Sequence, residues 1–178
     1  MPAHSLDLSQ IRISPFSSKD AIHNFRCGES DIDRWVSKAP KWSEQNKARL
    51  FLAHGQGNSK AMGFYSLSFS SEDRNKLAGK QDRQMWGSGV PLIYLQYLAV
   101  QRTCQNCGLG KMLLVDSLRR AHLVSKHVAF YGVGLRSLND RTTALYSKYG
   151  FAVAPDEDKF PLMILPIWSI NDLFEGRT

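Results

Sequence analysis

The chain has few cysteines, no long apolar run and fewer acidic than basic residues, and each shortage excludes a class of protein. Three cysteines among 178 residues, Cys27, Cys104 and Cys107, are an odd and small number that does not indicate a disulfide framework. No apolar run reaches the ~18 residues that a membrane-spanning helix needs. The first ten residues also lack the charged start and apolar block of a secretion signal. We therefore predict one cytoplasmic domain over residues 1–178, with no membrane partner.

The pair Cys104-x-x-Cys107 lacks the neighbours that a metal site or a redox site requires. Structural zinc takes four ligands, and the remaining candidates, Cys27, His122 and His127, do not have the spacing of a zinc site. A redox pair is expected at the start of a helix that directly follows a strand in a thioredoxin-like pattern, which this sequence lacks. We predict that both cysteines line a turn and that the chain binds no metal.

Basic residues outnumber acidic ones by 23 to 16, which gives a formal net charge of +7. Such an excess attracts nucleic acid, but a site for a single polyphosphate or an ordinary solvated surface also accounts for it. The charge alone leaves these alternatives open. The basic residues are densest in two groups, Lys38, Lys41, Lys47 and Arg49, and Arg74, Lys76, Lys80 and Arg83.

The spacing of apolar residues predicts strands that alternate with helices, preceded by a hairpin. The predicted strands cover residues 11–13, 50–54, 61–69, 92–100, 128–135 and 162–165. The first predicted helix starts at a capping box of Ser30 and Asp33 and should break at Pro40. Two more helices are predicted at 108–124 and 139–149, and the polar residues 70–89 predict a long loop, or a short helix and a loop. The pattern is typical of a mixed α/β domain in three layers.

One apolar strand leads into a helix through the turn Gln105-Asn106-Cys107-Gly108-Leu109-Gly110, which has the features of a phosphate site. Glycines let the backbone approach a ligand closely, and the first N–H groups of a helix have no partners inside it. Two other phosphate motifs are excluded. Met112 stands where a Walker loop needs Ser or Thr, and Leu113 stands where a dinucleotide fingerprint needs a third glycine.

This turn resembles the acetyl-CoA pyrophosphate loop of the GNAT N-acetyltransferase superfamily. A second block, Asn139-x6-Tyr146-x3-Gly150-Phe151, is similar to the next recurrent block of that family, and the two occur in the family's order. The resemblance implies the GNAT fold, an α/β (α+β) domain with a central, mixed, mostly antiparallel sheet and helices on both faces. It also implies an N-acetyltransferase that takes acetyl-CoA as its co-substrate.

The resemblance also implies roles for individual residues. Tyr146 would protonate the leaving thiolate, because a phenol stays protonated at neutral pH. The main chain of Leu98, Ala99 and Val100 would contact the pantetheine arm and supply N–H donors for the oxyanion. Asn139 would hold the same arm through its amide. The phosphates would bind the loop and the residue after it, namely Gln105, Asn106, Cys107, Gly108, Leu109, Gly110 and Lys111.

The N-terminal half resembles the toxin branch of this family, whose members acetylate the amino group of aminoacyl-tRNA and stop translation. The matching stretches are Phe25-x-Cys27-Gly28-x4-Asp33-x-Trp35, Ala48-Arg49-Leu50 and Gly63-Phe64-Tyr65-Ser66-Leu67. One stretch departs from the branch, because Gln96-Tyr97-Leu98-Ala99-Val100-Gln101 stands where the branch often has Gly-Arg-Leu-Ala-Val-Asp. The resemblance implies aminoacyl-tRNA and a small antitoxin as partners, together with a homodimer.

The residues by themselves do not identify a general base. Glu72 and Asp73 lie in the polar segment 70–89, and His54 ends a predicted strand. This absence favours a substrate that is already partly neutral, since an α-amino group has a pKa near 8, against about 10.4 for a lysine side chain. Three functions stay open: acetylation of aminoacyl-tRNA, acetylation of a small-molecule or protein amine, and non-catalytic binding of acetyl-CoA or RNA.

Overall fold

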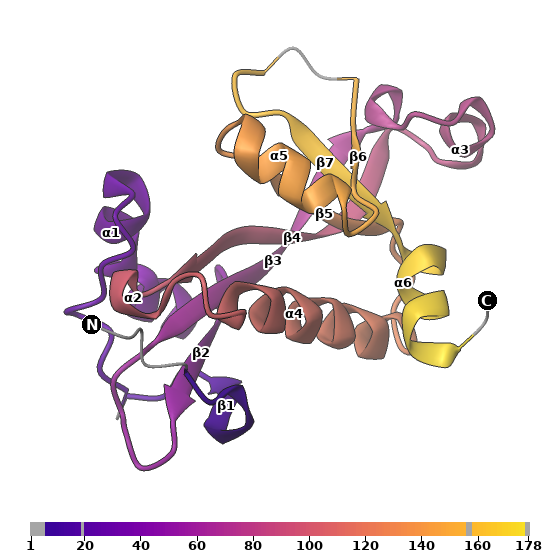
Figure 1. Cartoon of the computed structure of the whole chain (residues 1–178). Helices are drawn as coiled ribbons and strands as arrows, with labels where there is room; N and C mark the ends of the chain where they lie inside the picture. Colours follow the sequence, from indigo (N-terminus) through magenta and orange to yellow (C-terminus); the bar gives the residue numbers. More distant parts are fainter. Residues whose placement is uncertain (1–5, 19, 156–157, 177–178) are drawn as a thin grey trace. The chain divides into compact units, whose positions relative to one another are not determined.

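The computed structural model describes residues 6–18, 20–155 and 158–176, which divide into two compact units (Figure 1). Unit 1 covers residues 1–68 and 96–117, and unit 2 covers residues 69–95 and 118–178. The strands in the described residues follow the hydrogen-bonded order β1-β2-β3-β4-β5-β7-β6. The prediction of a single domain over residues 1–178 stays a prediction. None of the helices among the described residues is long and apolar enough to cross a membrane.

Unit 1 contains an N-terminal hairpin, two short helices and the chain segment around the predicted phosphate loop. Its elements are β1 (Ile11–Pro15), α1 (Ser30–Val36), α2 (Ala39–Glu44), β2 (Arg49–Gly55), the start of β3 (Gly63–Asp73), the end of β4 (Gly89–Val100) and the start of α4 (Leu109–Ser125). Short 3-10 turns cover Leu8–Gln10 and Arg102–Cys104. β1 pairs with β2 and β2 with β3, both antiparallel, which confirms the predicted hairpin.

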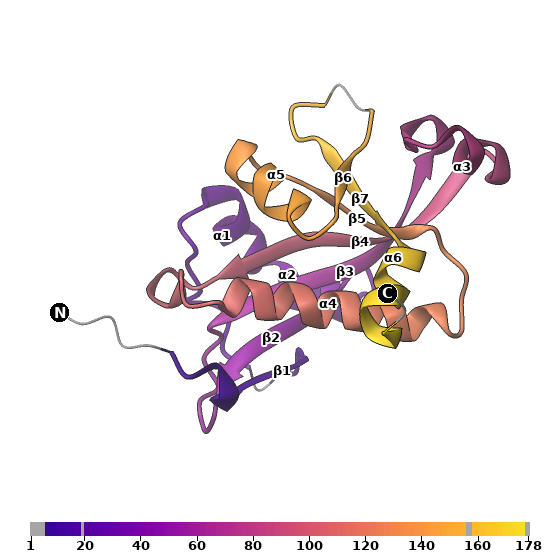
Figure 2. The same cartoon turned by 45° about the vertical axis from the view of Figure 1, so that its right-hand side comes forward.

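Unit 2 contains the remaining parts of β3, β4 and α4 and everything that follows α4. Its other elements are a 3-10 turn (Arg74–Lys76), α3 (Lys80–Met85), β5 (Gly132–Arg136), α5 (Asp140–Ser147), β6 (Ala152–Val153), β7 (Leu162–Pro166) and α6 (Ile167–Glu175). β4 pairs with β5 in parallel, whereas β5 and β6 each pair antiparallel with β7 (Figure 2). Strands of both senses mixed with helices confirm the predicted mixed α/β class.

Aromatic rings form much of the core of unit 1. Trp35 of α1 stacks on Phe64 of β3 at 5.9 Å between ring centroids, and Phe25 meets Phe64 edge to face at 5.0 Å. Tyr97 of β4 also packs on Trp35, with 4.4 Å between the ring centroids. Trp35 is only 7% exposed and belongs to this core. α1 is therefore anchored to the sheet by its aromatic side chain.

The predicted break at Pro40 is confirmed, but the predicted capping box before it is wrong. Pro40 lies in the first turn of α2, where its missing N–H costs nothing, and it separates α2 from α1. Ser30 begins α1 without a side-chain cap at the preceding Glu29. Asp33 instead accepts a hydrogen bond from the backbone N–H of Cys27 at 2.7 Å. The carboxylate fixes the turn that enters the helix rather than the helix's own first turn.

Two further predictions need correction, and two elements of the structure were not predicted. β3 continues through Ser70–Asp73, so part of the expected loop 70–89 is strand with alternating exposure, followed by α3. The strand expected from residue 128 begins only at Gly132, and Val128 and Ala129 before it are exposed. The short strand β6 and the C-terminal helix α6 were not expected.

We predict that replacing Gly132 with alanine destabilises the protein by about 3 kcal/mol, the upper end of what overpacking usually costs. A Cβ at Gly132 would overlap the Leu165 carbonyl and lie 2.9 Å from the Pro166 Cα, both backbone atoms of the paired strand β7. Urea unfolding of Gly132→Ala measures the change. Gly87→Ala is the matched control, since its Cβ would meet nothing within 4 Å. Equal stability of the two variants would contradict this account of the β5–β7 pair.

Candidate active site

The predicted phosphate loop is tied to its surroundings by one glutamine side chain. The Gln105 Nε2 donates to the Cys27 carbonyl at 2.7 Å and to the Val100 carbonyl at 3.1 Å. The first bond reaches the turn before α1, and the second reaches the end of β4. Backbone bonds add to this brace, since Gln101 N–H donates to the Met62 carbonyl at 2.8 Å. Gln105 therefore fixes the loop through its side chain, which leaves the backbone of the loop to meet a ligand.

Two residues of the loop adopt a left-handed backbone conformation. Asn106 has φ of 61° and Gly108 has φ of 90°, and α4 begins at the next residue, Leu109. Gly110 differs, because its φ is ordinary and a Cβ there would meet only Val100 Cγ2 at 3.7 Å. The protein alone thus has room for a side chain at Gly110. Its absence keeps the backbone open to a ligand, as predicted for this turn.

The start of α4 has the electrostatic character of an anion site. α4 is 17 residues long, its first turn carries no acidic residue, and Lys111 lies exposed in that turn. Leu109 and Leu113 are completely buried, so the helix start is held in the core of unit 1. The unpaired N–H groups and the positive end of the helix dipole favour a phosphate at this place.

The three cysteines are free thiols. Cys107 Sγ donates to the Cys104 carbonyl at 2.6 Å, so the pair closes a turn, as the sequence predicted. Cys27 is 9% exposed, and this burial raises the pKa of its thiol to about 11. Among the residues that the structure describes, no group of three or more His, Cys, Asp or Glu side chains could hold a metal ion.

Leu98, Ala99 and Val100 are the last three residues of β4, just before the loop. β4 pairs with β5 only from Leu92 to Tyr94 in the described part of the chain. The backbone groups of these three residues are therefore not used by that pairing. Leu98 and Val100 are half-buried, whereas Ala99 is buried in the aromatic core of unit 1.

In unit 2, the second predicted block builds α5 and the turn that follows it. Asn139 caps the helix, since its side chain accepts from Thr142 N–H at 3.0 Å. Gly150 takes φ of 91° and returns the chain toward the helix, where Phe151 N–H donates to the Tyr146 carbonyl at 3.3 Å. The Phe151 ring meets Tyr146 edge to face, 5.8 Å away. The block thus fixes the Tyr146 side chain. A role of Asn139 toward pantetheine stays a prediction.

Burial changes the acidity of Tyr146. Removal from water raises the pKa of its hydroxyl to about 12, and no charged or hydrogen-bonding partner among the described residues contributes to this shift. The phenol is therefore protonated and able to donate throughout the physiological range. Tyr97 of unit 1 also has a raised pKa, first from burial and then from the negative charge of Asp31.

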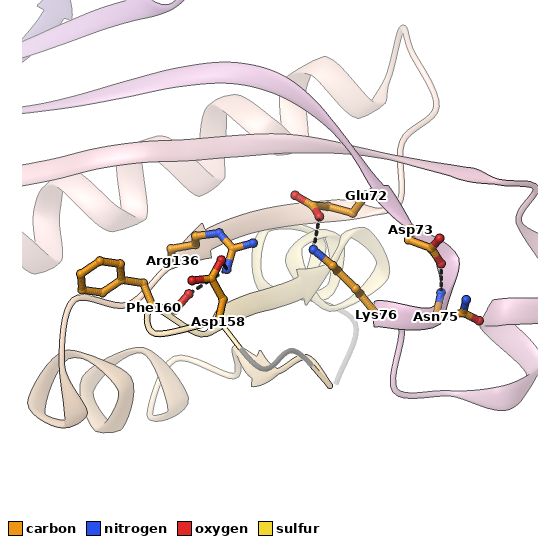
Figure 3. Close-up of polar contacts among 7 residues, drawn as sticks. All are labelled: Glu72, Asp73, Asn75, Lys76, Arg136, Asp158 and Phe160. Atoms are coloured by element: carbon orange, nitrogen blue, oxygen red, sulfur yellow. Dashed lines mark hydrogen bonds and ion pairs between the residues drawn. The ribbon is translucent and has the colours of Figure 1, made fainter.

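The three carboxylate or imidazole candidates for a general base all have structural partners. Glu72 accepts from Lys76 Nζ at 3.0 Å, and Asp73 accepts from the Asn75 backbone N–H at 2.7 Å (Figure 3). His54 of β2 is buried beside Asp20, with His54 Nε2 and Asp20 Oδ1 3.4 Å apart. Glu72 and Asp73 are thus each engaged in a local contact within their own segment.

The end of β5 is fixed by Arg136, an arginine that the sequence analysis did not single out. The Arg136 guanidinium donates to the Phe160 carbonyl at 2.7 Å and lies 3.3 Å from an Asp158 carboxylate oxygen (Figure 3). Partners separated by more than 20 positions leave no local pattern in a sequence, and the Gln105–Cys27 bond was missed for the same reason. Tyr146 and Asn139 lie in unit 2, whereas all other predicted site residues lie in unit 1.

Sequence comparison relates the chain to bacterial toxins. It is 30% identical over 150 residues to the "tRNA-acetylating toxin" of Mycobacterium tuberculosis, which covers 84% of this chain and 88% of that protein. It is 29% identical over 159 residues to the "probable toxin TacT" of Sinorhizobium fredii, with 84% and 86% covered. No protein-family model matches the chain.

Solved structures support the same relation. A tyrosine-to-phenylalanine variant of KacT is similar with a TM-score of 0.85, 26% identity and coverage of 93% of this chain and 99% of that one. AtaT complexed with acetyl-methionyl-tRNAfMet gives a TM-score of 0.84 at 20% identity, covering 92% and 99%. An AtaT variant bound to the C-terminus of the antitoxin AtaR and acetyl-CoA gives 0.77 at 20%, covering 93% and 98%. The two AtaT structures establish likeness of fold alone.

The mixed sheet and the braced loop at the start of α4 define an acetyltransferase of the GNAT class, and the predicted GNAT fold is confirmed. Within that class, the chain belongs to the tRNA-acetylating toxins of type II toxin–antitoxin systems.

Replacing Gly110 with alanine should affect stability and ligand binding in opposite directions. Alanine favours a helix over glycine, and the added Cβ meets no atom closer than 3.7 Å, so we expect the variant to gain about 0.5 kcal/mol. The same Cβ would obstruct a phosphate, so acetyl-CoA binding should weaken at least tenfold in calorimetry. Gly87→Ala, whose added Cβ would meet nothing within 4 Å, controls for the effect of a glycine-to-alanine change away from the loop. Unchanged affinity of Gly110→Ala would contradict the site.

Proposed function

We propose that this chain transfers the acetyl group of acetyl-CoA to the α-amino group of an aminoacyl-tRNA and thereby blocks translation. The observation that carries the proposal is the 30% identity, over most of both chains, to a tRNA-acetylating toxin. The loop at the start of α4 supplies a physical reason, because its braced and open backbone suits a pyrophosphate. The site residues of this proposal are those predicted from the sequence.

The acetyl-CoA contacts of this proposal are those that the sequence predicts. The loop Gln105–Gly110 and Lys111 hold the pyrophosphate through backbone N–H groups and charge. The main chain of Leu98, Ala99 and Val100 takes the pantetheine arm as an added strand would and offers N–H donors to the developing oxyanion. Asn139 contributes an amide to the same arm while it caps α5.

Tyr146 acts as the general acid. The amine nitrogen attacks the thioester carbon, the new amide bond forms, and the C–S bond breaks. The Tyr146 hydroxyl gives its proton to the leaving sulfur and is reprotonated from solvent, while the amine loses its extra proton to water. The raised pKa of about 12 keeps the phenol protonated for this step. A base is unnecessary if the substrate amine is an α-amine, since that group is already partly neutral at pH 7 to 8.

The partners follow from this function. AtaT was solved with the antitoxin AtaR and, separately, with an acetylated aminoacyl-tRNA. We infer an antitoxin for this chain as well, and the net charge of +7 favours an acidic one. The same charge favours the tRNA backbone. A homodimer and a cytoplasmic location, where charged tRNA is found, belong to the proposal.

The first test incubates the protein with labelled acetyl-CoA and a mixed pool of charged tRNA. Label should appear in the RNA fraction and leave it on mild alkaline hydrolysis of the ester. Tyr146→Phe should lose about 10²- to 10⁴-fold in rate, the usual contribution of a general acid, while acetyl-CoA binding persists. Tyr149→Phe, on the half-buried tyrosine just after α5, is the matched control and should stay active. An unlabelled RNA fraction, from protein that binds acetyl-CoA, would redirect the search to small-molecule or protein amines.

The pH dependence of the transfer step should reflect the buried phenol. The rate should rise as the substrate amine loses its proton near pH 8. It should not fall again by pH 10.5, because Tyr146 remains protonated below its pKa of about 12. Single-turnover rapid-quench measurements outrun hydrolysis of the ester and give this profile. A fall in rate centred near pH 10 would show that Tyr146 has the acidity of an ordinary tyrosine, and it would contradict the assignment.

A further inference from the structure

A hollow on unit 1 has no part in the acetyl-CoA site. It lies on α2 and the turn that follows it, and its volume is about 460 Å³, within the range of small-ligand sites. We call it the Trp42 hollow. Its lining residues are Ser37, Lys38, Lys41, Trp42, Gln45 and Lys47. None of them belongs to the loop 105–110 or to the end of β4.

The Trp42 ring in this hollow is held in place rather than free on the surface. It meets the buried Trp35 edge to face, with 6.1 Å between the ring centroids. The chain turns back at Asn46, whose φ is 57°, and Lys47 N–H donates to the Trp42 carbonyl at 2.9 Å. Lys47 Nζ thereby lies 5.8 Å from the centre of the Trp42 ring. The half-buried indole is a rigid apolar surface beside a cation.

The charge around the ring has a single sign. Lys38, Lys41 and Lys47 are all exposed, and within the described part of the chain no acidic residue lines the hollow. Neither the packing of α2 nor the acetyl-transfer chemistry requires these three lysines together. A fixed aromatic ring among lysines is the combination by which proteins bind unpaired nucleotides, whose bases stack on the ring and whose phosphates meet the cations.

We propose that the Trp42 hollow binds an unpaired nucleotide of the tRNA, with its base on the Trp42 indole and its phosphates on Lys38, Lys41 and Lys47. The proposal rests on the proposed function, because the acceptor named there is an RNA that ends in a single strand. The phosphates of acetyl-CoA already have a site at the start of α4. The hollow therefore belongs to the second substrate and adds to affinity for RNA through stacking and charge.

The test measures fluorescence anisotropy of a labelled RNA minihelix with a short unpaired 3′ tail and of the same duplex with a blunt end. Trp42→Ala should weaken binding of the tailed RNA about tenfold to hundredfold, the range for loss of one stacked base, and leave the blunt duplex unaffected. Lys41→Gln leaves the Trp35 contact intact and should lower the salt dependence of tailed-RNA binding by about one phosphate. Lys60→Gln, another exposed lysine of unit 1, is the charge-matched control and should change neither.

Two results would overturn the proposal. Equal losses for tailed and blunt RNA would show a non-specific basic surface, and a raised KM for acetyl-CoA with unchanged RNA binding would place the CoA nucleotide in the hollow. Urea unfolding verifies that Trp42→Ala is folded, and the lysine variant carries the test if it is not. The assay uses uncharged RNA and no transfer step. A protein that binds tailed RNA through Trp42 yet acetylates no aminoacyl-tRNA would refute the proposed function and leave this inference standing.

Discussion

The start of α4 has to present bare backbone to a ligand and yet remain fixed, and the rest of unit 1 is organised around that constraint. Side chains that cover the helix start would consume the N–H groups that a phosphate needs. The loop is instead fixed through the Gln105 side chain, which donates hydrogen bonds to the Cys27 and Val100 carbonyls. Burial of Leu109 and Leu113 holds the helix itself. The fold itself does not require a glycine at position 110, and its missing side chain leaves the backbone accessible to a ligand.

The same combination of a fixed frame and a reactive group recurs around Tyr146 in unit 2. Asn139 caps α5, Gly150 ends it in a left-handed conformation, and Phe151 packs against the tyrosine ring. These contacts close within a dozen residues, so the whole device is carried by one short stretch of chain. Burial of the phenol, which raises its pKa to about 12, suits a group that must keep its proton until sulfur leaves. In the Trp42 hollow the buried Trp35 likewise fixes the half-buried Trp42 ring.

Local patterns in the sequence were sufficient for most elements and failed where polar strands or distant partners were involved. The hairpin β2–β3, the break at Pro40 and the helix after Gly108 depend on neighbouring residues and were predicted correctly. Ser70–Asp73 was not recognised as strand, because its polar side chains show no apolar alternation. α6 was missed although Pro166 precedes it and Gly176, with φ of 68°, ends it. Its boundary signals were present, but an apolar strand directly before it obscured them.

The sequence by itself determined the class of fold, the strand–loop–helix unit with its two glycines and the block that positions Tyr146. Each of these depends on backbone preferences and short-range spacing, which a sequence records directly. The tertiary structure decided what the side chains do. In the structure, Asp33 accepts a hydrogen bond from the Cys27 backbone instead of capping the helix, and the Gln105 side chain braces the loop. The tertiary structure also placed Lys47 over Trp42. The Gln105 bond depends on where segments 78 positions apart meet in space. The Asp33 and Lys47 contacts are local, but they depend on the exact conformation of a turn, which the spacing of residues does not specify.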